Sequence, residues 1–236
     1  LEFDFIIVGA GSAGCVLANR LSANVKNSVL LLEAGPKDSY VPIHIPVAYS
    51  WALENQNMIW QYNTLPESKT SSRPHFYPRG KVLGGSSSVN GMLYVRGQPQ
   101  DYDSWGKEWG WKDVVPYFKK SEHYQGKEGP FHGKGGPLHV SFIEDKNPLS
   151  DALIEAGVAY GLPNNEDVND GDQLGIGYFS LTTKNGRRCS SASAFLTPIK
   201  SRKNLTIITD AQVKKLVFEQ NTCTGIEFDC RGVTQH

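Results

Sequence analysis

A glycine-cornered turn near the N-terminus is the sequence feature that most constrains the fold. Gly9, Gly11 and Gly14 have the spacing G-x-G-x-x-G, directly after the apolar run 5–8 and before a stretch with helical periodicity. The first glycine allows a tight turn, the second lets the backbone approach a pyrophosphate, and the third lets a helix pack close to the strand. The pattern therefore predicts a strand, a helix and a second strand around a dinucleotide-binding turn.

A second apolar run and an acidic residue complete this unit. Residues 28–32 are predicted to form the second strand, and Glu33 ends it about 20 residues after the glycines, where a carboxylate accepts hydrogen bonds from ribose hydroxyls. The N-terminal amides and the dipole of the intervening helix favour a phosphate anion. We therefore predict an adenine-dinucleotide site. The alternative is that the glycines only form a turn.

Charge and hydropathy exclude several classes of partner. The 236 residues carry 24 basic and 24 acidic side chains, so we expect no field that would recruit nucleic acid or an anionic membrane surface. The sequence has neither an apolar run of about 18 residues nor a basic-then-apolar leader, and we expect a soluble, mature or trimmed chain. We expect secretion, although the four cysteines by themselves do not determine the compartment.

Three short features concern modification and metals. Asn204 begins a glycosylation sequon, so we expect a glycoprotein, with a chance triplet at the start of a strand as the alternative. Residues 164–172 hold three aspartates and a glutamate but lack the ligand order of a calcium loop, so we predict a solvated loop and no metal site. Cys15 is predicted to be buried, whereas Cys223 and Cys230 flank a short strand and would be free to bridge elsewhere.

A second glycine- and serine-rich loop spans residues 79–97. Gly84 and Gly85 can adopt backbone angles closed to other residues and lie flat against a planar or phosphate-bearing ligand. Residues 86–88 are serines that offer donors at short range. A flexible linker would not need the apolar residues interleaved with them. We therefore predict that this loop also binds a ligand.

The rest of the chain gives weaker patterns. Residues 36–80 are rich in proline, asparagine, serine and aromatic residues, which predicts a long functional segment without clear elements. Asp113 is predicted to cap the N-terminus of a helix. The other predicted elements are helices over 147–161 and 190–195 and strands over 205–209, 212–219 and 224–229, with a turn at 220–221.

Three stretches together resemble the glucose-methanol-choline (GMC) family of FAD-dependent oxidoreductases. They are DFIIVGAGSAGCVLANRLS, GKVLGGSSSVNGMLYVRGQPQDYD and GRRCSSASAFLTPIKSRKNLTIITDAQVKKLVF. The middle stretch is a long match to that family's signature. The resemblance implies an α/β fold: a Rossmann-like FAD-binding domain, with a parallel sheet and helices on both faces, plus the start of an antiparallel-sheet substrate domain. It assigns residues 1–145 and 204–236 to the first domain and 146–203 to the second, with the family's C-terminal half absent.

The resemblance also implies a set of contacts to non-covalently bound FAD. The residues at the pyrophosphate and the adenosine ribose would be Gly9, Gly11, Ser12, Ala13, Gly14, Glu33 and Ala34. The residues along the flavin and the phosphates would be Arg79, Val82, Leu83, Gly84, Gly85 and Ser88. The remaining ones are Asn90, Gly91, Met92 and Leu93 at the isoalloxazine, Trp60 beside the flavin and Val213 at the adenine. Val89 stands where covalently flavinylated relatives have a histidine, which is why we expect a non-covalent cofactor.

The implied activity is oxidation of the CH–OH group of a small alcohol, with aromatic alcohols and cyanohydrins among the candidates. None of the six histidines (His44, His75, His123, His132, His139 and His236) matches the family's catalytic position. We therefore predict no catalytic residue in this chain, only surface or satisfied histidines. Either a companion C-terminal polypeptide of the same precursor supplies the base, or the sequence is a truncated piece. The alternatives are a hydroxynitrile (mandelonitrile) lyase with a redox-silent flavin and a non-catalytic FAD-binding fragment. A nicotinamide enzyme fits less well, because the loop 79–97 has no counterpart in such enzymes.

Overall fold

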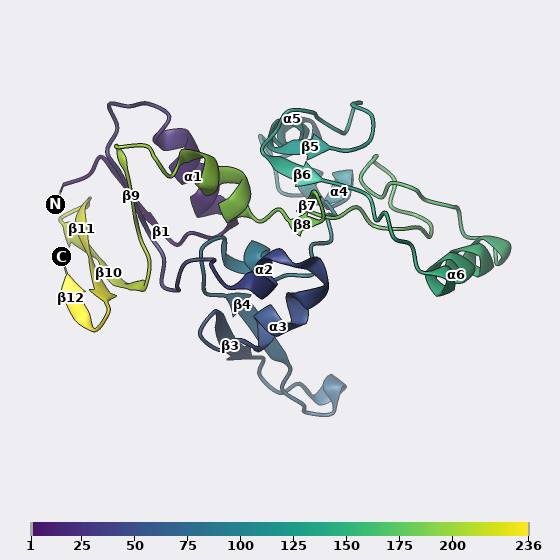
Figure 1. Ribbon diagram of the computed structural model, residues 1–236, viewed down its shortest axis with the longest axis horizontal. Helices are drawn as coiled ribbons and strands as arrows, with labels where there is room; N and C mark the ends of the chain where they lie inside the picture. The colour runs from purple at the N-terminus through teal and green to yellow at the C-terminus, as the bar shows by residue number, and fades with distance from the viewer. Residues whose placement is uncertain (1, 236) are drawn as a thin grey trace. The chain divides into compact units, whose positions relative to one another are not determined.

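The structure, a computed structural model, describes residues 2–235 and divides into two compact units (Figure 1). Unit 1 comprises Leu1–Gly91 and Ser190–His236, and unit 2 comprises Met92–Cys189. This division differs from the predicted domain boundaries after residues 145 and 203. The chain joins unit 1 already at Ser190, because the helical turn η4 (Ala192–Leu196) packs against the helix α1 (Ser12–Leu21).

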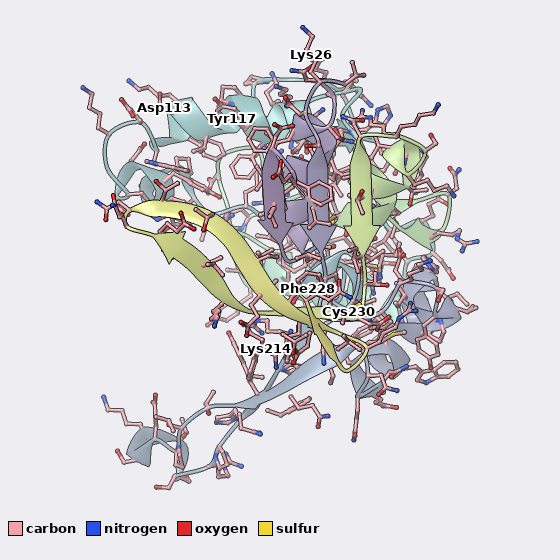
Figure 2. The ribbon with its side chains drawn as sticks, turned by 90° about the vertical axis from the view of Figure 1, so that its left-hand side faces the viewer. Lys26, Asp113, Tyr117, Lys214, Phe228 and Cys230 are labelled. Carbon is pink, nitrogen blue, oxygen red and sulfur yellow. The ribbon has the colours of Figure 1, made fainter. Side chains whose placement is uncertain are left out.

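Unit 1 is built on a three-stranded parallel sheet in the order β1–β2–β9. The strands are β1 (Phe5–Val8), β2 (Val29–Leu32) and β9 (Leu205–Ile208). Figure 2 shows them side by side with their arrowheads pointing the same way. All four residues of β2 are buried, as a central parallel strand requires. The predicted strand–helix–strand unit and its parallel sheet are confirmed.

The two faces of this sheet are covered differently. On one face α1 packs against β1 and β2. On the other face Leu30 and Leu32 form a buried cluster with Ala211, Ile226 and Phe228. The last three belong to an antiparallel sheet of β10 (Ala211–Glu219), β11 (Thr222–Cys230) and β12 (Val233–Gln235), which lies in front of the parallel sheet in Figure 2. In residues 2–235, strands therefore cover the face where a second layer of helices was predicted.

The predicted C-terminal strands and their turn are confirmed by β9, β10 and β11, whereas β12 was not predicted. Cys15 is buried, as predicted, and Cys223 and Cys230 both lie in β11 as free thiols. Because they are seven residues apart in one strand, their side chains are too far apart to form a disulfide with each other.

Residues 36–80 are more regular than predicted, and the expectation of a segment without clear elements is wrong. Their elements are α2 (Val41–His44), η1 (Pro46–Ala48), α3 (Tyr49–Glu54), β3 (Ile59–Asn63), η2 (Ser68–Thr70) and β4 (Phe76–Gly80). β3 and β4 form an antiparallel hairpin. Five apolar residues of this region and the following loop form a buried cluster: Ile43, Ala52, Met58, Val82 and Val89. Short helices and a strand that contains a proline give no clear helical or strand periodicity. The sequence pattern therefore did not indicate this packing.

Unit 2 consists of short elements joined by long loops. They are α4 (Pro99–Asp103), α5 (Trp111–Ser121), β5 (Glu122–Tyr124), β6 (Leu138–Val140), α6 (Pro148–Ala159), β7 (Thr183–Lys184) and β8 (Arg187–Arg188). β5 and β6 pair in parallel, and β7 and β8 pair antiparallel. The predicted helix α6 is confirmed, with Asn147 at its N-cap. The prediction that Asp113 caps α5 is wrong, because Gly110 is the N-cap and Asp113 lies in the first turn.

None of the helices described between residues 2 and 235 combines the length and the apolar composition that crossing a membrane requires.

Candidate cofactor-binding site

The first glycine turn has the backbone geometry that its spacing predicts. Gly9 has φ +91°, in the region that residues with a side chain rarely adopt. A Cβ atom on Gly14 would lie 1.9 Å from the carbonyl oxygen of Gly9 and 3.4 Å from a side-chain carbon of Ile7. The third glycine therefore allows α1 to pack directly on β1.

Gly11 is the N-cap of α1 and faces open space. A Cβ atom built there would meet no described atom within 4 Å. No described side chain caps this helix end, and its first turn holds no acidic residue. The N-terminal amides of α1 are therefore available to an external acceptor, and the helix dipole favours an anion there.

The second glycine loop lies against the first one. Gly84 (φ +89°) donates its N–H to the carbonyl oxygen of Ala10 at 2.7 Å. A Cβ atom on Gly85 (φ +54°) would lie 2.7 Å from the Cα of Gly11. The two loops, some seventy residues apart in sequence, are thus in backbone contact, and only glycine permits this approach.

A cavity of about 520 Å³ opens where these loops meet the ends of β1 and β2. Eight of the residues predicted to bind a cofactor line it: Gly9, Gly11, Ser12, Glu33, Ala34, Trp60, Gly85 and Val213. Six lining residues were not predicted as individual FAD contacts, although Gly80 and Ser86 belong to the predicted ligand-binding loop 79–97: Val8, Leu32, Gly80, Ser86, Ala211 and Gln212. Most of these are neighbours of predicted residues, so the two glycine loops and the strand after residue 210 were the signals that could have found them.

Glu33 lies at the end of β2 with its carboxylate buried. Its Oε2 accepts a hydrogen bond from the N–H of Ala10 (2.8 Å), and its Oε1 accepts one from the N–H of Gly35 (2.9 Å). Burial raises the pKa of Glu33, and the two backbone hydrogen bonds oppose that rise. The carboxylate therefore holds the glycine turn in place, and its oxygens retain lone pairs for a ribose hydroxyl.

The other predicted contact residues do not line this cavity. Ala13 and Gly14 lie in the first turn of α1, and Gly84 bonds to Ala10 as described. Val82 is buried in the apolar cluster, and the hydroxyl of Ser88 donates to the carbonyl oxygen of Leu83 at 2.6 Å. Asn90 and Gly91 end the loop in unit 1, whereas Met92 and Leu93 belong to unit 2.

Arg79 is turned toward its own strand. Its guanidinium carbon lies 3.9 Å from the centroid of the Tyr77 ring, and its Nη1 donates to the carbonyl oxygen of Pro78 at 2.8 Å. In this position the side chain of Arg79 does not line the cavity, and its contact with phosphates stays a prediction. Val89, the position of the covalent link in some relatives, is buried in the apolar cluster.

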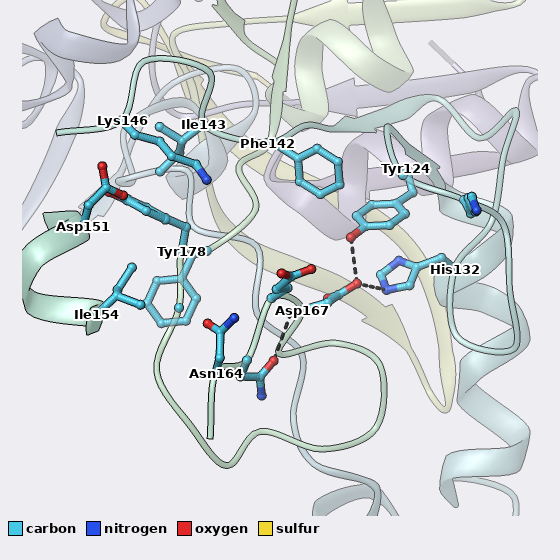
Figure 3. A pocket seen from close by; sticks show the side chains of 16 residues that line it. Tyr124, His132, Phe142, Ile143, Lys146, Asp151, Ile154, Asn164, Asp167 and Tyr178 are labelled. Carbon is cyan, nitrogen blue, oxygen red and sulfur yellow. Dashed lines mark hydrogen bonds and ion pairs between the residues drawn. The ribbon is translucent and has the colours of Figure 1, made fainter. Parts of the chain in front are cut away.

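Unit 2 contains a different polar centre, a buried network of charged side chains, of which Figure 3 shows His132 and Asp167. Nη2 of Arg96 lies 2.8 Å from Oε2 of Glu122, and His132 lies between Glu122 (3.2 Å) and Asp167 (2.9 Å). The hydroxyl of Tyr124 donates to the same Asp167 oxygen at 2.7 Å, and the Tyr124 and His132 rings stack. The side chains of Arg96 and Glu122 are 2% and 0% exposed.

The charges in this network support one another. Burial alone would lower the pKa of His132, but its bonds to Asp167 and Glu122 outweigh burial and raise the pKa to about 9. Burial alone would raise the pKa values of Glu122 and Asp167, but His132 and, at Glu122, Arg96 lower them. His132 is therefore protonated and both carboxylates are ionised at neutral pH. We interpret the network as a structural one, and it agrees with the prediction of a satisfied histidine.

The other histidines fit the same prediction within the described residues. Nε2 of His44 lies 2.7 Å from the carbonyl oxygen of Asp38, and the rings of His123 and His139 contact each other in a tilted arrangement with centroids 4.6 Å apart. His75 is exposed, and His236 lies outside the described residues. Residues 2–235 hold no cluster of three or more His, Cys, Asp or Glu side chains arranged to bind a metal ion.

A groove of about 640 Å³ adjoins the charged network. Its walls combine aromatic and aliphatic side chains with charged and polar ones, and Figure 3 shows Phe142, Ile143, Ile154 and Tyr178 around it, with Tyr124, His132 and Asp167 at one end. Ile154 belongs to α6, a helix without a buried residue in the described structure. The groove is therefore a gap between α6 and the rest of unit 2.

The cavity in unit 1 has the features that a dinucleotide requires. The open position at Gly11 and the free amides of α1 suit a pyrophosphate, and Glu33 suits a ribose. A side chain at Gly11 would project into the open space beside these amides. The residues that are present therefore fit FAD.

Comparison with known proteins points to one family. Residues 3–236 match the family model described as "GMC oxidoreductase". An alcohol dehydrogenase (acceptor) from Pseudomonas putida is 45% identical to this chain over 231 residues, which are 96% of this chain and 42% of that protein. The crystal structure of pyridoxine 4-oxidase from Mesorbium loti matches with a TM-score of 0.94 and 37% identity, over 99% of this chain and 47% of that chain. An FAD-dependent oxidoreductase from Chaetomium thermophilum matches with a TM-score of 0.91 and 28% identity, over 99% and 43%. This chain thus spans less than half the length of each of these proteins.

Proposed function

Because this chain belongs to the GMC oxidoreductase family, we propose that it is the cofactor-binding part of an enzyme that oxidises the CH–OH group of a small alcohol with non-covalent FAD. The observation that carries the proposal is the backbone contact between the two glycine loops. Both loops line one cavity, together with the carboxylate of Glu33, which we propose binds the ribose. The relatives named as alcohol dehydrogenase and pyridoxine 4-oxidase support the alcohol as the substrate class.

The residues of this chain bind and orient the cofactor. When bound, FAD supplies the hydride acceptor for alcohol oxidation. The free amides of α1 hold the pyrophosphate. Gly11 has no side chain, which leaves room for the pyrophosphate at the helix end. Glu33 accepts hydrogen bonds from the adenosine ribose, with its carboxylate already fixed by Ala10 and Gly35. Val213, proposed as the adenine contact, and Gln212 line the same cavity.

The proposal includes a companion polypeptide from the C-terminal half, which would supply the base that removes the hydroxyl proton. β1 is apolar throughout, yet within residues 2–235 it pairs with β2 alone, and its residues Phe5, Ile6 and Val8 are 39%, 37% and 53% exposed. Parallel strands are normally buried on both faces and paired on both edges. A further parallel strand at this edge would therefore complete the sheet.

Unit 2 gives independent support for the companion polypeptide. Leu149 and Leu153 lie one turn apart on α6 and are 79% and 66% exposed. The adjoining groove has aromatic walls that include the exposed Phe142 and Phe179. Apolar surface of this kind is normally covered in a stable protein. Segments of the proposed companion polypeptide are the occupants that we propose.

Flavin absorbance tests the enzyme. The purified protein, with any polypeptide that accompanies it, should be yellow, release FAD on denaturation and bleach anaerobically when an alcohol substrate is added. Pyridoxine and simple aliphatic and benzylic alcohols are the first compounds to try. A colourless protein that yields no FAD would refute the proposal. Cyanide release from mandelonitrile with the flavin still oxidised would replace it with the lyase alternative, and bound FAD without turnover in the complete protein would leave the non-catalytic fragment.

The mass of the native particle tests the companion polypeptide. Native mass spectrometry should give a particle heavier than the 26.0 kDa of this chain, and denaturing conditions should separate a second polypeptide from it or show one longer chain. A native particle that contains only copies of the 26.0 kDa chain and still oxidises alcohols would contradict this part of the proposal.

Secretion and glycosylation of Asn204 remain predictions. The side-chain amide of Asn204 donates hydrogen bonds to the carbonyl oxygens of Ser22 (3.1 Å), Asn24 (3.1 Å) and Asn27 (2.8 Å). A glycan would replace one of the two hydrogens that make these bonds, so the geometry disfavours modification. A mass change after treatment with a glycosidase that removes N-linked glycans would show that the site is nevertheless used.

A further inference from the structure

The described residues that line the cavity in unit 1 carry a net negative charge, although the proposed ligand is itself an anion. Among the described residues that line it, Glu33 is the only one with a charged side chain, and that charge is negative. A dinucleotide brings two further negative charges on its pyrophosphate. The N-terminus of α1 offers the equivalent of about half a positive charge. A fixed cation near the cavity would therefore strengthen binding considerably.

Lys81 has the position that such a cation needs. It follows β4, and its N–H donates to the carbonyl oxygen of Met58 at 2.7 Å. Its carbonyl group packs on Gly35, where an added Cβ would lie 1.8 Å from the oxygen. The backbone of Lys81 is thus fixed beside the turn that follows Glu33, and its predecessor Gly80 lines the cavity.

The side chain of Lys81 rests on an aromatic ring that also lines the cavity. Its Nζ lies 4.5 Å from the centroid of the Trp60 ring, a cation–π distance. The positive charge of Lys81 also acts on Glu33: burial raises the pKa of that carboxylate, and Lys81 is among the groups that oppose the rise. The ammonium group is therefore close enough to interact electrostatically with both Trp60 and Glu33, which line the cavity.

We propose that Lys81, held on Trp60, is the cationic residue of this site and binds the diphosphate of the dinucleotide. The proposal deepens the proposed function and rests on it, because it concerns the same cavity. Trp60 then has a defined task. It limits the positions open to the flexible lysine side chain, so that less conformational entropy is lost when the anion binds.

Lys69 provides a matched control. It carries the same charge and is exposed in η2, between β3 and β4. Neither Lys69 nor Lys81 lines the cavity, but Lys81 rests on Trp60, which does. A general loss of positive charge would make the two substitutions equivalent, whereas a specific cationic site makes only Lys81 important.

The test measures ligand affinity by titration of the flavin-free protein, with any accompanying polypeptide retained. The ligands are FAD, ADP and adenosine, each at low and at high salt. We expect Lys81→Met to weaken FAD and ADP by about tenfold at low salt, since it removes a charge-assisted hydrogen bond, and by less at high salt. Adenosine has no phosphate, so its affinity should not change. Lys81→Arg should restore most of the affinity, and Lys69→Met should leave all three affinities within about twofold of wild type, as expected for an exposed charge.

The outcomes separate this proposal from the function itself. Equal affinities of Lys81→Met and wild type for FAD and ADP would overturn the role of Lys81 while the flavoprotein assignment stands. A parallel loss of adenosine affinity would also overturn it, because the effect would then be structural. If wild type binds neither FAD nor ADP, the proposed function fails first. Trp60→Leu adds a second check: it should weaken ADP more than adenosine, and equal weakening would show that Trp60 serves the nucleoside alone.

Discussion

The two glycine loops, the N-terminus of α1 and Glu33 form the cofactor-binding cradle of unit 1. This cradle differs from the charged network of unit 2 both in the groups that form it and in what those groups bind. The cradle is formed by backbone: two glycine loops in contact, free helix amides and carbonyl groups, with one carboxylate. The network is formed by side chains of Arg96, Glu122, His132 and Asp167, all largely buried and ion-paired to each other. The first leaves its polar groups open for a ligand. The second leaves its charges balanced within the protein.

This difference explains why one region is a binding site and the other is not. An open helix end at Gly11 can lower its free energy only by binding an external acceptor. In the network each charge faces an opposite charge, and removal of one member leaves a buried charge without compensation. Perturbations should therefore damage folding in unit 2 and ligand binding in unit 1.

The largest effect is expected from Glu122→Gln. This substitution leaves the buried Arg96 with an uncharged partner and removes one of the two carboxylate partners of His132, and we expect a loss of about 3–5 kcal/mol in the free energy of unfolding. Urea unfolding would measure the loss, and hydrogen exchange over residues 122–140 would locate it. The control is Lys215→Met, which breaks the exposed 2.9 Å pair with Glu227 and should lower the free energy by less than about 1 kcal/mol. Similar losses in both variants would remove the distinction between buried and exposed pairs.

Gly14→Ala should have the next largest effect, because it tests packing within the cradle. The added Cβ would lie 1.9 Å from the carbonyl oxygen of Gly9, and such overpacking lowers the free energy of unfolding by about 1–3 kcal/mol. A thermal melt in the absence of FAD isolates this effect from ligand binding. An unchanged melting temperature would mean that α1 can move away from β1 without loss.

The pH dependence of unit 2 should be more gradual. The raised pKa of His132 means that its contribution is complete below about 6.5, its ordinary value, and is lost as the pH rises through about 9. The lowered pKa values of Glu122 and Asp167 mean that their contributions are present above their ordinary values of 4.5 and 3.8 and are lost in more acidic solution. Unfolding midpoints of unit 2, followed by hydrogen exchange, should therefore be highest between about pH 5 and 6.5. His132→Gln should flatten the alkaline decline; an identical decline in that variant would exclude His132 as its source.

The smallest effect on folding, and the sharpest contrast, is expected from Gly11→Ala. The new methyl group meets no described atom, and the backbone there has ordinary angles, so the free energy of unfolding should change by less than about 1 kcal/mol. The affinity for FAD should nevertheless fall by at least about tenfold, since the methyl group occupies the approach of the pyrophosphate. Titration with FAD beside a melt of the flavin-free protein measures both. Unchanged affinity would show that the pyrophosphate lies elsewhere.

The sequence predicted the parts of this protein that depend on local backbone rules. The positions of Gly9, Gly11 and Gly14 predicted the turn, the helix and their order, and Glu33 was found by its distance from them. These features were predictable because a positive φ or a close backbone approach restricts the residue type at each position. The same rule identified Gly84 and Gly85 as a second loop, and the resemblance to a family linked both loops to one cofactor.

Only the tertiary structure decided which distant residues meet. The contact between Lys81 and Trp60 depends on the pairing of β3 and β4, and Arg96, Glu122, His132 and Asp167 lie in four separate segments without a common spacing. The structure also covered one face of the parallel sheet with a β-hairpin and gave the amide of Asn204 three carbonyl partners. The physical reason is the same in each case. Backbone geometry restricts a residue through its nearest neighbours in the chain, whereas ion pairs and packing depend on long-range contacts that leave no pattern in the sequence.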